Sequence, residues 1–539
     1  MVGLGFQYQR ILLAWLAFFS FSLLGSPEVL AEEDEKPTAV LGEIPPPAPL
    51  HELWKKVPVY QPMPPAGMTM IFPKGEGYYS LRDVLQDRNR KSRPKYPYPT
   101  FSLRAAPFFD ADWRYLDNPT AEEHDYCDFF KRIHIHDDWL FTTGGEFRWR
   151  FENQVNRFLT NKDDNFNLFR QDVYGDIAYQ DWFRFYIEFL DAESIHQNLP
   201  PSVFDYSQAE FLDLFVEFKL GERPGGNPVQ FRAGRQELLY GSQRLISPLE
   251  WANARRTFQG VKLFTQGEKW NFDLFWVQPV VPQLGSANSQ DNGQNFTGLW
   301  LTHKPKPGTF LDFYALNLDQ ANRVALGEDR RPGTFNVTTL GSRFYGREQD
   351  WLYDVEPILQ VGRWSDQTLI TGAFTISGGY IFEKLPLKPQ LWLAEDFASG
   401  TPYPFKGNQF STFQQLFPFG HYYFGAIDIV GRQNINDLNG QLVVFPCNWI
   451  SSTLQFHHFN LVCSRDFLYS AGGKPLRRDP SGNAGSDVGN ELDFYVNFTL
   501  SPHQNILVGY SKLFQGRFLQ ETGSLQSPEA TYMQYGFRW

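Results

Sequence analysis

The chain has few cysteines for its length of 539 residues. Only Cys127, Cys447 and Cys463 occur, and this small, odd number excludes a framework of several disulfides. A single bridge between Cys447 and Cys463 is compatible with the sequence, but the two residues can also lie unpaired on neighbouring strands. We expect them to be unpaired.

A basic surface is also missing. The 49 Lys and Arg residues against 60 Asp and Glu residues give a formal net charge of −11. Taken as a whole, the chain therefore lacks the electrostatic footprint of a protein that binds nucleic acid. No glycine-rich nucleotide loop and no evident series of Ser, His and acidic residues occurs, so the sequence predicts neither a cofactor nor an enzyme.

Clusters of metal-binding side chains are scarce too. The motif HIHDD holds four such residues at strand spacing, namely His134, His136, Asp137 and Asp138. A solvated approach to the first strand explains these residues without a metal ion. We therefore expect no metal site.

Only one long apolar run occurs, and it lies near the N-terminus. Arg10 precedes apolar residues 11–24. The tripeptide VLA at 29–31, just before the acidic EEDEK, has the small or aliphatic residues that a signal peptidase accepts at its cleavage site. Residues 1–31 are predicted to be a signal peptide, with an uncleaved anchor as the alternative. No later stretch reaches about eighteen uninterrupted apolar residues, so the mature chain is predicted to have no membrane helix.

Prolines concentrate in the next part of the chain. Between Pro37 and Pro119 lie 15 of the 37 prolines, with little sustained periodicity. Because proline fixes its backbone angle and lacks a ladder donor, residues 37–119 are predicted to be extended linker and not sheet. They lie in a proline-rich leader, residues 32–138, whose structure the sequence leaves open. Two arrangements stay open: the leader lines or plugs another part of the fold, or it is a disordered extension.

From Trp139 the sequence alternates between apolar and polar residues. In GEFRWRFEN, Phe147, Trp149 and Phe151 alternate with charged residues. The same pattern returns in WFRFYIEFLD, FLDLFVEFKL, KWNFDLFWV and NELDFYVNFTL. Side chains alternate faces along a strand, so each segment predicts a strand with one apolar and one charged face.

Strands of this kind fit two architectures. A soluble sandwich also alternates, but its strands average five or six residues. These segments approach about ten residues, which is the length a tilted strand needs to cross a bilayer. Since a sheet in lipid must close, residues 139–539 are predicted to form an all-β fold, a closed antiparallel transmembrane β-barrel of about 18 strands.

The last strand carries a further signal. The chain ends on TYMQYGFRW, where Phe537 and Trp539 lie on an apolar face. A terminal aromatic resembles the assembly signal of bacterial outer-membrane barrels. This resemblance implies the barrel-assembly machinery and outer-membrane lipid as partners; the alternative is that Trp539 caps a soluble sheet.

Several segments resemble one family, the alginate-export outer-membrane proteins. The fit is closest in FRAGRQELLYGSQRLISPLEWANARRTFQGVKL, from Phe231 to Leu263. Supporting segments are GGEFRWRFEN, DFASGTPYP, TFQQLFP and GNELDFYVNFTLSPHQNILVGYSKLFQGRF. Together they cover residues 139–539 in order, and the leader resembles nothing in the family.

The resemblance implies a function. It predicts an 18-stranded monomeric barrel in the cell outer membrane that passes an anionic, alginate-like polysaccharide outward through an arginine-lined lumen. Two alternatives from other classes stay open. One is a general or nutrient-uptake outer-membrane porin, and the other is an outer-membrane lipase or deacylase, whose site would be assembled in space.

Arginines are the candidate pore residues, because guanidinium groups bind carboxylates bidentately. Strand parity places five on the polar face, and a bulge at Gly234 is expected to turn Arg235 inward as well. The five arginines between residues 232 and 256 also outnumber the two acidic residues in the same stretch, Glu237 and Glu250. The candidates are Arg148, Arg150, Arg170, Arg184, Arg232, Arg235, Arg244, Arg255 and Arg256.

A structural explanation competes with the pore role of each arginine. Residues 139–280 contain 15 Lys and Arg against 19 Asp and Glu, so their formal balance is −4. Such a segment can also form an internal salt-bridge network that holds the barrel wall together.

Overall fold

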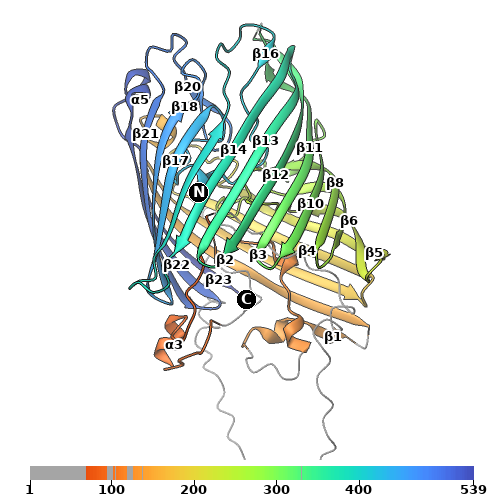
Figure 1. Cartoon of the computed structure of the whole chain (residues 1–539). Helices are drawn as coiled ribbons and strands as arrows, with labels where there is room; N and C mark the ends of the chain where they lie inside the picture. Colours follow the sequence, from red (N-terminus) through yellow and green to blue (C-terminus); the bar gives the residue numbers. More distant parts are fainter. Residues whose placement is uncertain (1–67, 94–100, 103–104, 118–124, 136–137, 329) are drawn as a thin grey trace, which may run out of the picture. The chain divides into compact units, whose positions relative to one another are not determined.

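Long antiparallel strands dominate the computed structural model, which describes residues 68–93, 101–102, 105–117, 125–135, 138–328 and 330–539. The predicted signal peptide and residues 32–67 of the leader lie outside these residues, as do His136 and Asp137 of the HIHDD motif. Eighteen strands form one closed sheet (Figure 1). They are β2 (Trp139–Val155), β3 (Asp164–Tyr179), β4 (Phe183–Ile195), β5 (Ser207–Arg223), β6 (Asn227–Gln236), β7 (Phe258–Gln266), β8 (Trp270–Val281), β10 (Gln294–Lys306), β11 (Thr309–Leu326), β12 (Pro332–Glu348), β13 (Trp351–Trp364), β14 (Gln367–Ile381), β15 (Gln390–Ala398), β17 (Ile435–Cys447), β18 (Ile450–Leu461), β21 (Asp487–Ser501), β22 (Gln504–Gln515) and β23 (Glu529–Arg538).

Short elements flank or interrupt the barrel. Among the described residues, no helix is long and apolar enough to cross a membrane. The short strands are β1 (Ile133–Ile135), β9 (Ser289–Gln290), β16 (Gln409–Phe410), β19 (Leu468–Tyr469) and β20 (Pro475–Arg477). The helices and 3-10 turns are α3 (Leu81–Leu85), η2 (Phe108–Asp110), η3 (Arg114–Asp117), η4 (Asp128–Phe130), η5 (Arg157–Leu159), α4 (Gly420–Tyr423) and α5 (Arg517–Thr522).

The sheet closes where its last strand meets its first. β23 pairs antiparallel with β2, from Glu146 opposite Arg538 to Val155 opposite Glu529. Every strand of the ring thus has two hydrogen-bonded neighbours, which is what a lipid environment requires of backbone N–H and C=O groups. The predicted closed barrel is confirmed. All three cysteines are free, as expected for Cys447 and Cys463.

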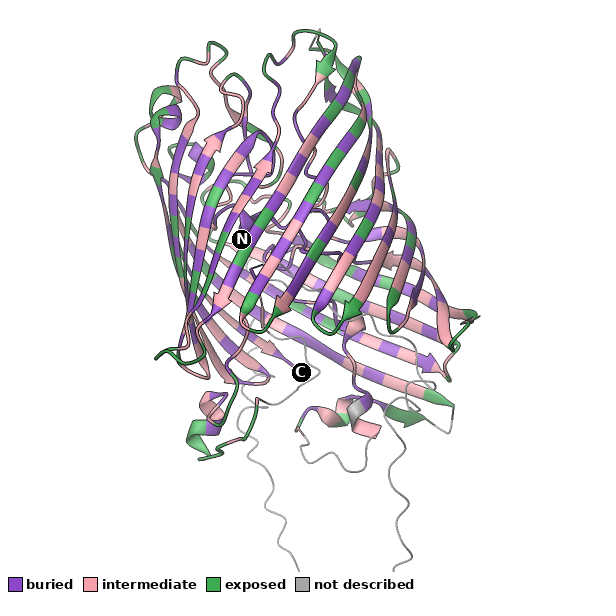
Figure 2. Ribbon diagram, in the orientation of Figure 1, coloured by how far each residue is buried: buried purple, intermediate pink, exposed green. Residues whose placement is uncertain are grey.

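The two faces of the wall differ in the way that the alternation predicts. On β15, Leu391 and Leu393 are exposed, whereas Trp392 between them is completely buried. Figure 2 shows the same alternation along the other strands of the wall. Apolar side chains point outward, and most inward positions are polar or aromatic.

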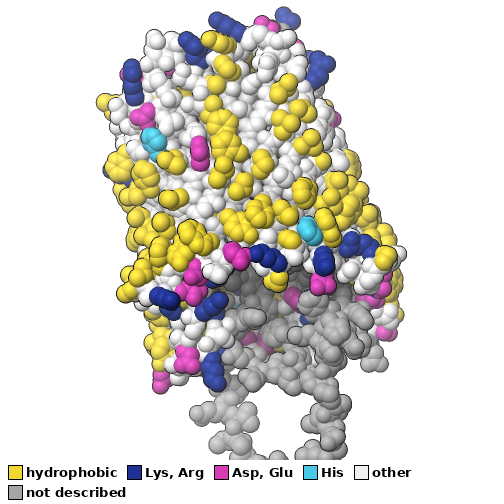
Figure 3. Space-filling view, in the orientation of Figure 1, with side chains coloured by type: hydrophobic (Ala, Val, Ile, Leu, Met, Phe, Trp, Pro, Cys, Tyr) yellow, Lys and Arg dark blue, Asp and Glu magenta, His cyan; other side chains and the backbone are white. Residues whose placement is uncertain are grey.

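The outer surface is apolar over the flank of the barrel. On the face drawn in Figure 3, hydrophobic side chains cover the flank, and most charged side chains gather near its two ends. Exposed tryptophans mark one end: Trp139, Trp182, Trp270 and Trp351 all lie at or beside the same ends of their strands. A tryptophan girdle of this kind is typical of a bilayer interface.

The two ends of the barrel have different connections. At the tryptophan end most turns are short, such as residues 180–182 and 224–226. The opposite end carries long connections, including residues 237–257 and 399–434. In outer-membrane barrels short turns face the periplasm and long loops face outward. We call the two ends the short-turn end and the long-loop end.

Gly145 lies at the closing seam and leaves no room for a side chain. A Cβ at this position would collide with the backbone oxygen of Asp172 and lie 2.7 Å from the ring of Trp539. Gly145→Ala should therefore destabilise closure by about 1–3 kcal/mol, the usual cost of overpacking. The measurement is the fraction of protein that migrates as a heat-modifiable barrel.

Gly221 provides the matched control, because nothing lies within 4 Å of a Cβ built there. Gly221→Ala should leave the folded fraction unchanged. Equal folded fractions for the two variants would contradict tight packing at the seam.

The role of Phe537 and Trp539 as an assembly signal stays a prediction.

Candidate functional site

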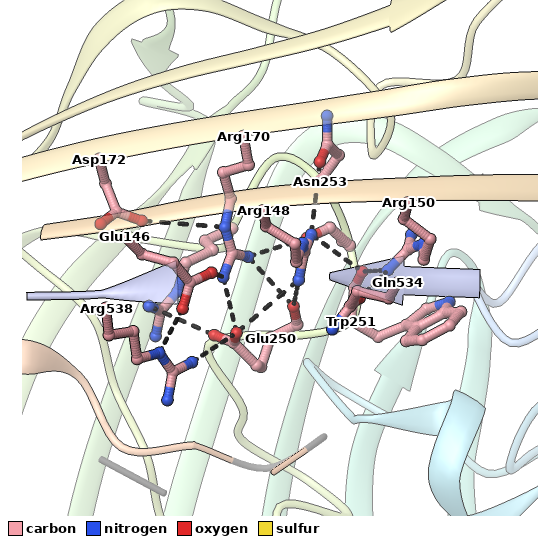
Figure 4. Close-up of polar contacts among 12 residues, drawn as sticks. Glu146, Arg148, Arg150, Arg170, Asp172, Glu250, Trp251, Asn253, Gln534 and Arg538 are labelled. Atoms are coloured by element: carbon pink, nitrogen blue, oxygen red, sulfur yellow. Dashed lines mark hydrogen bonds and ion pairs between the residues drawn. The ribbon is translucent and has the colours of Figure 1, made fainter. Parts of the chain in front are cut away.

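A long connection folds into the barrel and contacts its inner wall. Residues 237–257, the first inner loop, join β6 to β7 at the long-loop end. Arg148 on β2 donates to the backbone oxygens of Glu250 and Ala252 at 2.7 and 2.8 Å. Arg150 donates to the oxygen of Trp251 at 2.7 Å, and its guanidinium lies 3.7 Å from the centre of that indole ring. Two wall arginines therefore hold the loop mainly through its backbone (Figure 4).

Glu250 is the common acceptor of this network. Its carboxylate lies 2.6 Å from Arg170 of β3, 3.4 Å from Arg538 of β23 and 3.3 Å from Arg255 of the loop itself. Burial alone would raise the pKa of Glu250, but the guanidinium groups of Arg170 and Arg255 outweigh burial and lower it. Arg148 of β2 lies 3.7 Å away as well, so the ionised carboxylate fixes the first inner loop to three strands (Figure 4).

The wall carboxylates complete the charge pairing. Glu146 of β2 forms ion pairs with both Arg170 and Arg538. Around the loop base, five arginines meet five carboxylates. The arginines are Arg148, Arg150, Arg170, Arg255 and Arg538, and the carboxylates are Glu146, Glu152, Asp172, Glu237 and Glu250.

The other part of the loop contacts the opposite side of the ring. Arg244 pairs with Asp396 of β15 at 3.1 Å and with Asp354 of β13 at 3.4 Å. Arg343 of β12 binds the same Asp354 at 2.7 Å. Since β2 and β13 lie far apart around the ring, the first inner loop crosses the lumen.

A second connection enters the lumen and pairs with the first. Residues 399–434, the second inner loop, contain β16 and α4. The backbone N–H of Phe417 donates to the oxygen of Leu245 at 2.9 Å, and that of Ser247 donates back to the oxygen of Phe417 at 3.0 Å. Trp251 stacks on His421 at 4.1 Å between ring centres. The two inner loops therefore form one unit.

Arg256 differs from the arginines of the ion-pair networks. It donates to the backbone oxygens of Phe417 at 2.5 Å and Pro418 at 3.2 Å, which fastens the second inner loop to the first. Among the described residues, no carboxylate lies within ion-pair distance of Arg256. Burial lowers the pKa of this guanidinium to about 10.

The described part of the leader contacts the inner face near the short-turn end. Phe109 packs edge-on against Tyr186 and Phe215 at 5.5 and 5.2 Å between ring centres. Arg184 donates to the backbone oxygen of Phe109 at 2.7 Å, and the guanidinium of Arg232 lies 4.5 Å from its ring. This leader segment therefore occupies the inside of the wall.

The candidate arginines fall into separate groups. Arg148, Arg150, Arg170 and Arg255 meet around Glu250, as described above. Arg184 and Arg232 pair with Asp176 and Glu217, each at 2.8 Å, beneath the leader. Arg244 joins the opposite wall, and Arg256 binds the second inner loop. The candidate arginines therefore do not all meet at one place, and most of them are buried in ion pairs and backbone contacts.

Arg235 departs from its predicted position. The pairing of β6 with β5 and β7 continues through Gly234 without a register shift, so the predicted bulge is absent. Arg235 lies opposite Leu214, an exposed residue of the outer face, and pairs with Glu210 at 2.9 Å. Without a bulge, the alternation of side chains along β6 puts Arg235 on the opposite face from Arg232, apart from the buried networks.

Residues 140–533 match the model of a protein family described as alginate export. The chain belongs to the alginate export family. The family and the closed barrel together place the chain in the outer membrane as a channel protein. The alginate-export match begins in β2 and ends in β23, so it covers the barrel and leaves out the leader.

Comparison with curated protein sequences gave no match. Among solved structures, the chain is similar to OccD3 (OpdP) of Pseudomonas aeruginosa, with 10% sequence identity and a TM-score of 0.49 over 74% of this chain and 91% of that one. For the outer membrane protein OprD from Pseudomonas aeruginosa the identity is 10% and the TM-score 0.46, over 74% of this chain and 94% of that one. Similarity this low says nothing about what the alginate-export barrel transports.

Several network residues were not candidates in the sequence. Strand parity places all of them except Arg432, which lies in the second inner loop, on the polar face. It does not show which residues they pair with, because those partners are distant in the chain. The unpredicted residues are Glu146, Asp172, Arg343, Asp354, Asp396, Arg432 and Arg538.

Removing the charge of Glu250 should release the first inner loop. Glu250→Gln leaves buried guanidinium groups without their shared carboxylate, a change that costs about 3–5 kcal/mol for a buried ion pair. Trypsin should then cut the folded barrel after Arg255 or Arg256 at least about tenfold faster, because local opening exposes them. Mass spectrometry of the fragments measures the rate.

Glu222→Gln is the control, since Glu222 pairs with Lys219 at an exposed position where an ion pair contributes about 0–1 kcal/mol. Its cleavage rate should equal that of the wild type. A Glu250→Gln protein with wild-type resistance at Arg255 and Arg256 would show that Glu250 does not hold the loop.

Proposed function

We propose that this alginate-export channel passes an anionic, alginate-like polysaccharide out of the cell along the arginines of its lumen. Membership of the alginate export family is the observation that carries this proposal. The inner wall supports it with guanidinium groups on neighbouring strands, which suit the carboxylates of a polyuronate. Monomeric state and contact with the barrel-assembly machinery belong to the same proposal.

The charge balance of the wall favours one side of the lumen. With the inner loops in place, arginines and carboxylates balance around Glu250. When the two inner loops withdraw together, they take Glu237, Glu250, Arg244, Arg255 and Arg432 with them. Four arginines then face three carboxylates on β2, β3 and β23, whereas Arg343 faces four carboxylates on the opposite wall. An anionic polymer should follow the β2–β3–β23 side.

The contacts of Arg148 and Arg150 suggest how a polymer displaces the loop. In the closed arrangement Arg148 donates to two neutral backbone oxygens, and Arg150 donates to one while it also pairs with Glu152. A hydrogen bond to a charged partner contributes about 1.5–3 kcal/mol, against about 0.5–1.5 kcal/mol for a neutral one. Uronate carboxylates therefore compete with the loop for these donors, and each exchange favours the open channel by about 1 kcal/mol.

The leader takes part in the same opening. Phe108 and Phe109 cover inner-face aromatic residues near the short-turn end, where a polymer from the periplasm would enter. We therefore assign residues 105–117 the role of a plug at this mouth. The plug leaves the wall when the polymer enters.

The test is the block of ionic current by polyuronate in a planar bilayer. In Arg148→Gln/Arg150→Gln, the polyuronate concentration that halves the current should rise about tenfold or more, equivalent to a loss of at least about 1.4 kcal/mol. The control is Arg517→Gln, because Arg517 is exposed and its ion pair is with the neighbouring Glu521. This control should be blocked like the wild type.

A wild-type channel that prefers cations and ignores polyuronate would contradict the proposal. That result would favour the general or nutrient-uptake porin. Equal block of the double variant and the wild type would instead remove Arg148 and Arg150 from the polymer path.

A further inference from the structure

Three metal-binding side chains converge outside the lumen networks. Asp125 and Cys127 lie in the leader just before η4, and His503 lies in the turn between β21 and β22 at the short-turn end. One ligand atom from each, a carboxylate oxygen, the thiol sulfur and an imidazole nitrogen, lies within 4.8 Å of the other two. Residues almost 380 positions apart in the sequence thus meet at one point.

The hydrogen bonds of His503 orient its ring toward this point. Its Nδ1 lies 2.6 Å from the backbone oxygen of Arg538, which can only accept, so Nδ1 carries a hydrogen. Its Nε2 lies 2.6 Å from Oδ1 of Asp125. In the neutral imidazole, Nε2 then carries a lone pair that points at the carboxylate oxygen of Asp125, and the two repel each other. A proton or a metal cation between the two atoms removes this repulsion. A carbonyl on the other ring nitrogen is the usual support of a metal-binding histidine.

Burial separates His503 and Cys127 from solvent. His503 is completely buried, and Cys127 is 2% exposed and packs with Ala111, Trp113 and Trp539. Cys127 forms no disulfide. The backbone N–H of Cys127 donates to Oδ1 of Asp125 at 3.0 Å, which holds the two leader ligands together.

We propose that Asp125, Cys127 and His503 form a binding site for a borderline-soft divalent cation such as Zn²⁺. One sulfur, one imidazole nitrogen and one carboxylate oxygen are a ligand set that Zn²⁺ accepts in proteins. Tetrahedral Zn²⁺ would hold these atoms about 3.3–3.7 Å apart. Side-chain shifts of about 1 Å therefore convert the observed cluster into a coordination sphere.

The site joins the leader to the barrel. Asp125 and Cys127 belong to the leader, whereas His503 belongs to a turn of the wall. One cation bound to all three would therefore attach the leader to the barrel. This inference goes beyond the transported polymer and does not depend on it. It gives the leader a metal-dependent attachment at the short-turn end.

The experiment uses the folded full chain in detergent, stripped with a chelator and titrated with Co²⁺ as a probe for Zn²⁺. We expect one equivalent of Co²⁺ to produce a thiolate-to-cobalt charge-transfer band that Zn²⁺ then removes. Cys127→Ser should abolish the band. Asp125→Asn and His503→Asn should weaken Zn²⁺ binding at least about tenfold.

Cys463→Ser and His458→Asn are the matched controls, since these residues lie outside the cluster, and both should bind like the wild type. Heat-modifiability shows whether each variant is folded; if Cys127→Ser does not fold, the other two variants decide. A folded wild type without the band, or one whose Zn²⁺ affinity none of the three changes affects, would overturn the site. His503 and Asp125 would then share a proton only.

Discussion

The requirement that every backbone polar group be satisfied in lipid determines this structure. It forces the sheet to close, with β23 paired to β2, and it sends the apolar half of each strand outward. The polar half must then face a confined interior. Buried charges there are costly unless they are paired, so arginines and carboxylates of neighbouring strands bind one another and the inner loops.

The strands were predictable because their signal is local. In GEFRWRFEN the period of two assigns Phe147 and Trp149 to one face and Arg148 and Arg150 to the other, and the structure places these arginines on the inner face. The same parity shows why the inward turn of Arg235 was wrong: glycine permits a bulge but does not create one. A register shift needs a mismatch with the neighbouring strands, and β5 and β7 continue in register past Gly234.

The lumen network was not predictable in the same way. Glu250 was visible only as a nearby acid, whereas its partners Arg170 and Arg538 lie 80 and 288 positions away. No period in the sequence indicates that residues 237–257 turn inward. The contact of the leader with the wall was not predictable either. In the sequence Phe109 is part of a proline-rich segment, and only the structure places it against the inner-face rings of Tyr186 and Phe215.

The ion pairs around Glu250 also bear on the order in which the molecule forms. Glu146 belongs to the first strand of the ring and Arg538 to the last, so the complete acceptor site for the loop exists only once the two ends of the sheet have met. Before that moment Arg148, Arg150 and Arg170 of β2 and β3 can contact the loop, but Arg538 is missing from the site. The complete network therefore forms only with closure, and that step brings together residues of very high sequence separation, the kind of contact that folds slowly.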